Sequence, residues 1–380
     1  MLITNLPDLA DAAACPRLVI KVGSSLLVGK QGVRRDWLET LVAEIASAKA
    51  RGQEVIVVSS GAIALGAATL GLGKGGRGSL ADAQAAAAVG QIALSGLWAQ
   101  LLGGHGLTAA QLLLTLEDLE DRRRYLNVTA TLTRLLDMGA VPVINENDSV
   151  ATEEIRFGDN DRLAARVAQA AQASAVLLLS DIDGLYDRNP ADPAAVVLPQ
   201  VRGVTAEIHA MATGASGSGM GSGGMTSKLQ AAEIAERAGI ALAIINGIHD
   251  APIGRALGAQ GQGGIGTLFL PKRKAAARKA WLGGRLRLKG ALVIDAGAAQ
   301  ALAQGSSLLA AGITLIEGKF RRGDAIAIRD AAGAVLAHGL SEYDADECVA
   351  LIGRHSREHG EILGYAPRPA VIHRDQLVLL

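Results

Sequence analysis

Short apolar runs that alternate with segments of helical spacing constrain this chain most. Strands are predicted at residues 17–22, 54–59, 107–114, 141–145, 175–180 and 241–246. Helices are predicted before Gly52, over 81–103, 119–138 and 159–172, and from Thr226 to Gly239. A strand with no polar alternation is buried on both faces, so the pattern predicts a mainly parallel sheet sandwiched by helices.

The predicted strands end in polar residues. Their last positions read Lys21-Val22-Gly23-Ser24, Ser59-Ser60-Gly61, Asn145-Glu146-Asn147-Asp148 and Ser180-Asp181. Ligands bind at the carboxyl ends of parallel strands, so we expect one site at this edge of the sheet. A lysine at the end of a buried strand is costly unless it is paired. Because Gly23 and Ser24 follow Lys21, a phosphate-binding role is favoured over a lysine that merely reaches solvent.

A glycine-rich loop, Gly214 to Lys228, leads into the helix predicted from Thr226. Six of its fifteen residues are glycine. A loop of this kind exposes backbone N–H groups at a helix N-terminus, which binds anions. Lys228 adds a positive charge where a first helical turn normally favours an acid. The loop therefore indicates a polyphosphate ligand, with a flexible surface linker as the alternative.

Composition indicates a cytoplasmic protein. The formal net charge is zero, and the two cysteines, Cys15 and Cys348, lie far apart in the sequence. The first sixteen residues lack the pattern of a signal peptide, and we expect no apolar run of membrane-spanning length. The seven histidines are scattered, so no metal-binding pattern is present.

The pattern changes after Leu270. Residues 272–280 are basic, Gly283 and Gly284 follow, and short alternating runs then continue to the end. We predict an α/β domain over 1–271, a basic linker over 272–284 and a small β-barrel-like domain over 285–380. The last region contains eleven Lys or Arg and eleven Asp or Glu. It therefore lacks the basic charge typical of a nucleic-acid-binding domain.

Six motifs together resemble the glutamate 5-kinases of the amino-acid kinase superfamily. They lie at residues 21–25, 59–63, 145–148, 156–161, 180–186 and 223–229. The segments 305–309, 323–324 and 372–375 resemble the PUA domain that many bacterial members carry. The resemblance covers nearly the whole chain, in the order of the family.

This resemblance implies ATP-dependent phosphorylation of the γ-carboxylate of L-glutamate to L-glutamyl 5-phosphate, which opens proline biosynthesis. ATP is the co-substrate, and Mg²⁺ accompanies it. The resemblance also implies a homo-oligomer and the next enzyme of the pathway, glutamyl phosphate reductase, as partners. No RNA or membrane partner is expected.

The resemblance also implies residue roles. Lys21 and Lys228 should hold the ATP phosphates and act in catalysis, with Asp161 orienting both. The other nucleotide-binding positions are Ser180, Asp181, Ser222, Gly223, Gly224, Met225, Thr226 and Ser227. Glutamate should contact Ser60, Asp148 and Asn160, with Asp148 as the partner of its ammonium group; no metal ligand is assigned.

The nucleotide loop departs from the family pattern in two ways. Met225-Thr226-Ser227 stands where many members have Ser-Thr before the lysine, and residues 215–222 lengthen the loop. Both orders keep two hydroxyl groups, so only fine contacts to the nucleotide are affected.

The implied reaction needs no general base. A γ-carboxylate with a reference pKa of about 4.3 is already ionised at pH 7. The main barrier is repulsion between this carboxylate and the polyphosphate, which positioning and cationic groups can lower. Two alternatives stay open: a kinase for acetylglutamate, aspartate, carbamate or a nucleotide, and an RNA-binding protein acting through the PUA domain.

Overall fold

The computed structural model describes residues 2–29, 32–150, 160–213, 224–258, 264–272, 288–365 and 367–380. The chain divides into two compact units: Met1–Glu120 with Val128–Lys274, and Asp121–Asn127 with Ala275–Leu380. The predicted domain boundaries adjoin or fall within residues 273–287, which lie outside the described part, so they stay predictions.

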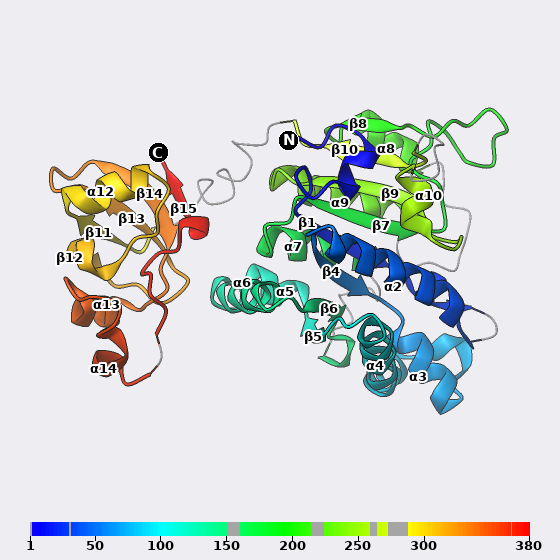
Figure 1. Ribbon diagram of the computed structural model, residues 1–380, viewed down its shortest axis with the longest axis horizontal. Helices are drawn as coiled ribbons and strands as arrows, with labels where there is room; N and C mark the ends of the chain where they lie inside the picture. The colour runs from blue at the N-terminus through cyan, green and yellow to red at the C-terminus, as the bar shows by residue number, and fades with distance from the viewer. Residues whose placement is uncertain are drawn as a thin grey trace. The chain divides into compact units, whose positions relative to one another are not determined.

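An eight-stranded sheet forms the centre of the first unit, in the order β5-β6-β4-β1-β7-β9-β10-β8 (Figure 1). Its strands are β1 (Arg17–Val22), β4 (Glu54–Ser59), β5 (Ala109–Leu114), β6 (Val141–Glu146), β7 (Ala175–Ser180), β8 (Gln200–Arg202), β9 (Ala241–Asn246) and β10 (Thr267–Leu270). Neighbouring strands are parallel except β9 and β10, which are antiparallel. The prediction of a mainly parallel sheet is confirmed. A separate short hairpin joins β2 (Val28–Gly29) and β3 (Gly32–Val33).

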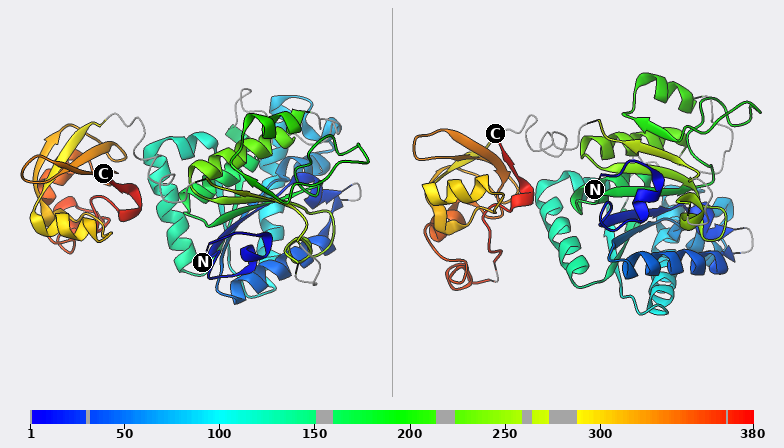
Figure 2. Two further views of the ribbon diagram at one scale, coloured as in Figure 1. Left: turned by 90° about the horizontal axis from the view of Figure 1, so that it is seen from above. Right: turned by 45° about the horizontal axis from the view of Figure 1, so that its top comes forward.

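Helices cover both faces of this sheet (Figure 2). The helices between residues 6 and 256 are η1 (Leu6–Ala10), α1 (Ser24–Leu27), α2 (Arg35–Ala50), α3 (Ala62–Leu70), η2 (Gly73–Gly76), α4 (Leu80–Gly103), α5 (Leu116–Glu120), α6 (Arg122–Asp137), η3 (Asp148–Val150), α7 (Asn160–Ala170), α8 (Ala206–Thr213), α9 (Met225–Arg237) and α10 (Pro252–Ala256). Leu18, Ile20 and Val22 of β1 pack into one core with α2 and α4. Alternation along the strand turns Lys21 to the opposite face, where α7 and α9 pack against each other.

The helix predicted over 119–138 is two helices, α5 and α6. They separate at Asp121, whose carboxylate accepts a hydrogen bond from the Arg124 N–H at 2.9 Å. A side chain that bonds the backbone three residues ahead starts a new helix, which is why the single predicted helix is wrong.

Helices α3 and α4 cross at two glycines. A Cβ placed on Gly66 would lie 1.8 Å from the carbonyl oxygen of Ala86, and one on Gly90 would lie 1.8 Å from that of Ala62. Only glycine permits this approach, so the backbones of α3 and α4 lie against each other at these two positions. Among the described residues, α4 is long and apolar enough, by length and composition, to span a membrane; an 18-residue window of it has a mean hydropathy of 1.4. By length and composition, the expectation that no apolar segment reaches membrane-spanning length is therefore wrong, because the alanines of α4 raise its mean hydropathy. The core helix of a soluble protein passes the same test.

The second unit contains its own five-stranded sheet, in the order β12-β11-β13-β14-β15. The strands are β11 (Gly290–Ile294), β12 (Ile313–Gly318), β13 (Ala325–Arg329), β14 (Val335–Leu340) and β15 (Leu377–Leu379). All neighbours are antiparallel except β11 and β13. The accompanying helices are α12 (Ala296–Ala303), η4 (Ala310–Gly312), α13 (Ala345–Leu351), α14 (His359–Leu363) and η5 (Arg374–Gln376). A core around Leu292, Ile326 and Tyr343 belongs to this unit alone, as predicted for a separate β domain.

Candidate active site

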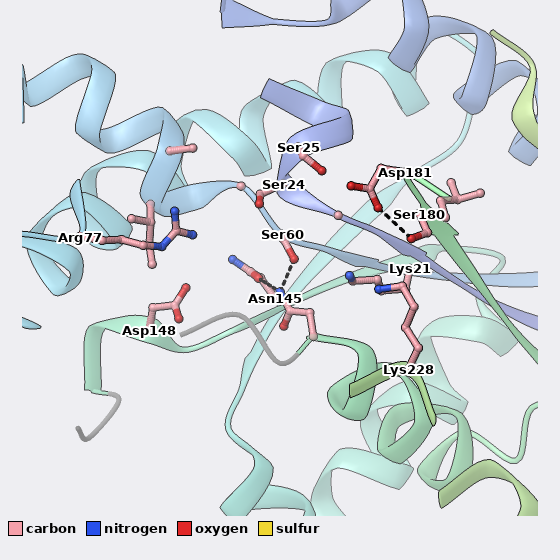
Figure 3. A pocket seen from close by; sticks show the side chains of 16 residues that line it. Lys21, Ser24, Ser25, Ser60, Arg77, Asn145, Asp148, Ser180, Asp181 and Lys228 are labelled. Carbon is pink, nitrogen blue, oxygen red and sulfur yellow. Dashed lines mark hydrogen bonds between the residues drawn. The ribbon is translucent and has the colours of Figure 1, made fainter. Parts of the chain in front are cut away.

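A pocket lies where β1, β4, β6 and β7 end (Figure 3). About 750 Å³ of empty space, part of it open solvent, lies among its lining residues. Its lining residues are Lys21, Gly23, Ser24, Ser25, Ser60, Gly61, Ile63, Ala64, Arg77, Asn145, Asp148, Asn160, Leu179, Ser180, Asp181 and Lys228. The fold therefore brings residues from distant parts of the sequence to the sheet edge at which a site is predicted.

Two lysines share one buried carboxylate beside this pocket. Lys21 Nζ, at the end of β1, lies 2.7 Å from Asp161 Oδ1. Lys228 Nζ, in the first turn of α9, lies 3.0 Å from Asp161 Oδ2. The Asp161 side chain is only 1% exposed and each lysine side chain 9%. One carboxylate thus holds two cations whose sequence positions differ by about two hundred residues, and the group keeps a net positive charge.

Opposing effects act on Asp161. Burial alone would raise the pKa of its carboxyl group, but the charges of Lys21 and Lys228 outweigh burial and hold the pKa below its usual range. Asp161 is therefore ionised at neutral pH and positions both ammonium groups. Two ammonium groups beside a pocket are suited to bind a polyanion.

A chain of amide and hydroxyl groups forms the floor of the pocket. The Asn160 amide Nδ2 donates to Ser60 Oγ at 2.6 Å and to Asn145 Oδ1 at 3.1 Å. The Asn145 amide in turn donates to Gln91 Oε1 at 2.8 Å. Among the described residues, no donor reaches the buried Asn160 Oδ1. That oxygen is an acceptor that a ligand's N–H groups could satisfy.

The turn after β4 depends on Gly61. Its φ of +119° lies in the left-handed region, and a Cβ there would come within 3.3 Å of Leu27 Cδ2. A larger residue would be strained at this position. Gly61 also caps the N-terminus of α3, so the turn places the Ser60 hydroxyl beside the amide of Asn160.

Asp148 and Arg77 line the other end of the pocket, away from the lysines (Figure 3). Burial raises the pKa of Asp148 to about 6, and the nearby Arg77 charge acts in the opposite direction. This end therefore combines one acid and one base, whereas the lysine end is cationic.

The nucleotide-binding predictions fall on two elements. Ser180 and Asp181 end β7 and line the pocket, and the Ser180 hydroxyl lies 3.3 Å from Asp181 Oδ1. Gly224 precedes α9 in an extended conformation with no side-chain cap, and the positive end of the dipole of such a helix favours an anion. The first turn contains Met225, Thr226 and Ser227, which are not part of the pocket lining described above. Ser222 and Gly223 lie outside the described residues, as do Asp159, the preceding part of its motif (156–158), and most of the loop beginning at Gly214.

Comparison with known proteins decides the family. Residues 16–246 match the model of the amino acid kinase family, and residues 290–363 match the PUA domain. The chain belongs to the amino acid kinase family. A protein of Novosphingobium aromaticivorans named glutamate 5-kinase is 72% identical and covers 100% of both chains. Proteins with that name from Sphingopyxis alaskensis (98% of this chain, 100% of theirs) and Zymomonas mobilis subsp. mobilis (96% and 92%) are 60% and 56% identical.

Some residues of this amino acid kinase site had no predicted role. Asn145 stood inside a recognised motif, but only the folded chain shows that it connects Asn160 to Gln91. Arg77 lies in a glycine-rich stretch with no strand, helix or motif pattern. The sequence contained no signal that places it opposite Asp148.

Among the described residues of the pocket, Asp181 offers a carboxylate that could hold Mg²⁺. Among the described residues, no three His, Cys, Asp or Glu side chains gather closely enough to hold a metal ion. Asp161 is already paired with two lysines. Mg²⁺ is commonly held by one or two carboxylates together with substrate phosphates, so Asp181 fits an ion that enters with ATP.

Proposed function

We propose that this amino acid kinase transfers the γ-phosphoryl group of ATP to the γ-carboxylate of L-glutamate. The product would be L-glutamyl 5-phosphate, formed in the first step of proline biosynthesis. The observation that carries the proposal is the Lys21–Asp161–Lys228 group at one end of a pocket whose other end contains Asp148. The name shared by the full-length relatives supports the same activity.

The step is an in-line displacement. A γ-carboxylate oxygen forms a bond to the γ-phosphorus of ATP, the bond from that phosphorus to the β,γ-bridging oxygen breaks, and its electron pair leaves on ADP. No proton moves, because the nucleophile is already ionised at neutral pH. The two lysines offset the repulsion between carboxylate and polyphosphate, and Asp161 fixes their positions.

Different residues of the site would bind the amino acid and the nucleotide. The carboxylate of Asp148 would pair with the substrate ammonium group, while Ser60 and Asn160 hold the substrate between the two ends. Ser180, Asp181 and the start of α9 from Gly224 to Ser227 would hold the nucleotide, together with Ser222 and Gly223. Mg²⁺ bound to the phosphates would add positive charge that further lowers the repulsion.

We also propose where the protein acts, which partners it has and where its domains begin and end. It acts in the cytoplasm as a homo-oligomer and passes its product to glutamyl phosphate reductase. The acyl phosphate hydrolyses readily, so rapid transfer would protect it. The kinase domain spans residues 1–271, a basic linker spans 272–284, and the PUA domain spans 285–380.

A hydroxylamine trap tests the activity. The protein is incubated with MgATP, hydroxylamine and one acceptor: glutamate, N-acetylglutamate, aspartate or carbamate. Hydroxylamine converts an acyl phosphate to a hydroxamate and phosphate, so we expect hydroxamate with glutamate far above the others. Hydroxamate mainly from N-acetylglutamate or aspartate would contradict the assigned substrate, and none from any acceptor would contradict acyl-phosphate formation.

A further inference from the structure

The phosphoryl transfer described above assigns no role to Arg77, which lines the pocket together with Lys21 and Lys228. It lies at the end of η2 and lines the cavity opposite Asp148 (Figure 3). Among the described residues, no carboxylate lies within 4.0 Å of its guanidinium group, although its charge acts on Asp148. The guanidinium is therefore available to a ligand.

The backbone around Arg77 is fixed on both sides. Gly76 has a φ of +75°, and a Cβ there would lie 2.8 Å from the Cβ of Ala67, so only glycine fits against α3. Two residues after Arg77, the Ser79 hydroxyl accepts a hydrogen bond from the Asp82 N–H at 3.0 Å and caps α4. A long side chain on a fixed backbone can be aimed at the pocket at a smaller loss of conformational entropy.

The charges at this end of the pocket match an α-amino acid. An α-amino acid carries an ammonium and a carboxylate group on one carbon, and the pocket presents Asp148 and Arg77 from two walls. The planar guanidinium group binds a carboxylate through two parallel hydrogen bonds. The reacting carboxylate must lie at the other end, beside Lys21 and Lys228.

We propose that Arg77 binds the α-carboxylate of the substrate and so selects acceptors in which that carboxylate is free. The inference rests on the proposed function, in which Asp148 pairs with the substrate ammonium group. Arg77 is then a specificity-determining residue on a loop that follows α3, distinct from the lysines that act on the phosphates.

The test compares glutamate with its α-amide, which keeps the ammonium and γ-carboxylate groups but lacks the α-carboxylate charge. Arg77→Gln should lower kcat/KM for glutamate on the order of 10- to 100-fold, mainly through KM. It should leave KM for ATP and the slower reaction of the α-amide unchanged. Arg77→Lys should restore part of the loss, because it returns the charge without the planar fork.

Lys74→Gln is the matched control. It removes one positive charge from the same turn, but Lys74 does not line the pocket. Its kinetic constants should stay close to those of the wild type. If Arg77→Gln lowers kcat/KM equally for glutamate and its α-amide, or lowers neither, the inference is overturned while the proposed function stays intact. A wild-type protein that forms no hydroxamate from glutamate would overturn both.

Discussion

Replacing Asp161 with asparagine isolates the role of the carboxylate shared by the two lysines. The change keeps the size of the side chain and removes one negative charge that is only 1% exposed. Lys21 and Lys228 would then face each other across a neutral amide, with nothing to offset their repulsion. We expect lower stability and a loss of turnover on the order of 10²-fold, because both ammonium groups move.

The size of the stability loss follows from burial. Removing one partner of a buried ion pair costs about 3–5 kcal/mol, which for a domain of this size lowers Tm on the order of 10 °C. The pKa of Asp161 is lowered in the folded protein, so its contribution is fully present above the unfolded pKa of about 3.9 and is lost as pH falls through the folded pKa. The measurement therefore belongs at pH 7, where the whole effect is present.

Glu54→Gln provides the control. It breaks the Arg17–Glu54 ion pair, 2.7 Å long, at the other end of β1, where the side chains are 20% and 32% exposed. Such a pair is worth up to about 1 kcal/mol, so Tm should change little and turnover not at all.

Thermal unfolding with and without a non-hydrolysable ATP analogue completes the assay. The analogue supplies phosphate charge to the two lysines, so it should raise the Tm of Asp161→Asn more than that of the wild type. An Asp161→Asn protein with wild-type Tm and turnover would refute the view that this carboxylate positions the lysines.

Four further predictions concern the rest of the molecule. Lys21→Ala and Lys228→Ala should each lower kcat on the order of 10²- to 10³-fold with a smaller effect on Tm, because Asp161 keeps one partner; near-normal turnover would contradict the phosphate role. Asp148→Asn should raise KM for glutamate but not for ATP, and it should abolish a fall in kcat/KM for glutamate below the Asp148 pKa of about 6; a rise in KM for ATP instead would mean that the half-sites are reversed. Gly90→Ala should cost about 1–3 kcal/mol in denaturant unfolding because α4 meets α3 there, whereas Gly96→Ala, with nothing within 4 Å, should gain about 0.5–1 kcal/mol; equal effects would contradict the close crossing. A fragment ending at Lys274 should still form the trapped hydroxamate, and a folded but inactive fragment would show that the C-terminal unit completes the site.

The central strands could be predicted closely from the sequence. The structure has β1 at Arg17–Val22, β4 at Glu54–Ser59 and β7 at Ala175–Ser180, matching the predicted runs. These strands are buried on both faces, so their apolar residues form continuous runs that end sharply in polar ones. The polar residues at the ends of these strands also predicted the edge of the sheet at which the pocket lies.

Shorter elements left no such pattern. Helix α3 contains mainly alanine and other small residues, and it depends on its crossing with α4 rather than on a periodic apolar face. Strands β8 and β10 have three and four residues, too few for a periodicity, and the antiparallel pairing of β10 with β9 is set by the folded sheet.

The residues of the site also divide into those that the sequence predicted and those that it did not. The motif resemblance named Lys21, Asp161 and Lys228, yet the sharing of one carboxylate by both lysines depends on contacts between β1, α7 and α9. Arg77 belongs to no motif, and only the folding of η2 against α3 places it at the pocket. Resemblance therefore identified the chemistry, and the fold was needed for the geometry.

Oxygen transfer tests the central claim most directly. Glutamate labelled with ¹⁸O in its γ-carboxylate is incubated with the protein, MgATP and hydroxylamine, and the released inorganic phosphate is analysed by mass spectrometry. If the γ-carboxylate attacks the γ-phosphorus, hydroxylamine expels phosphate that retains the bridging oxygen, so one ¹⁸O from glutamate appears in each phosphate. Phosphate without the label, released at the rate of ADP formation, would show that water rather than the γ-carboxylate accepts the phosphoryl group and would contradict the account.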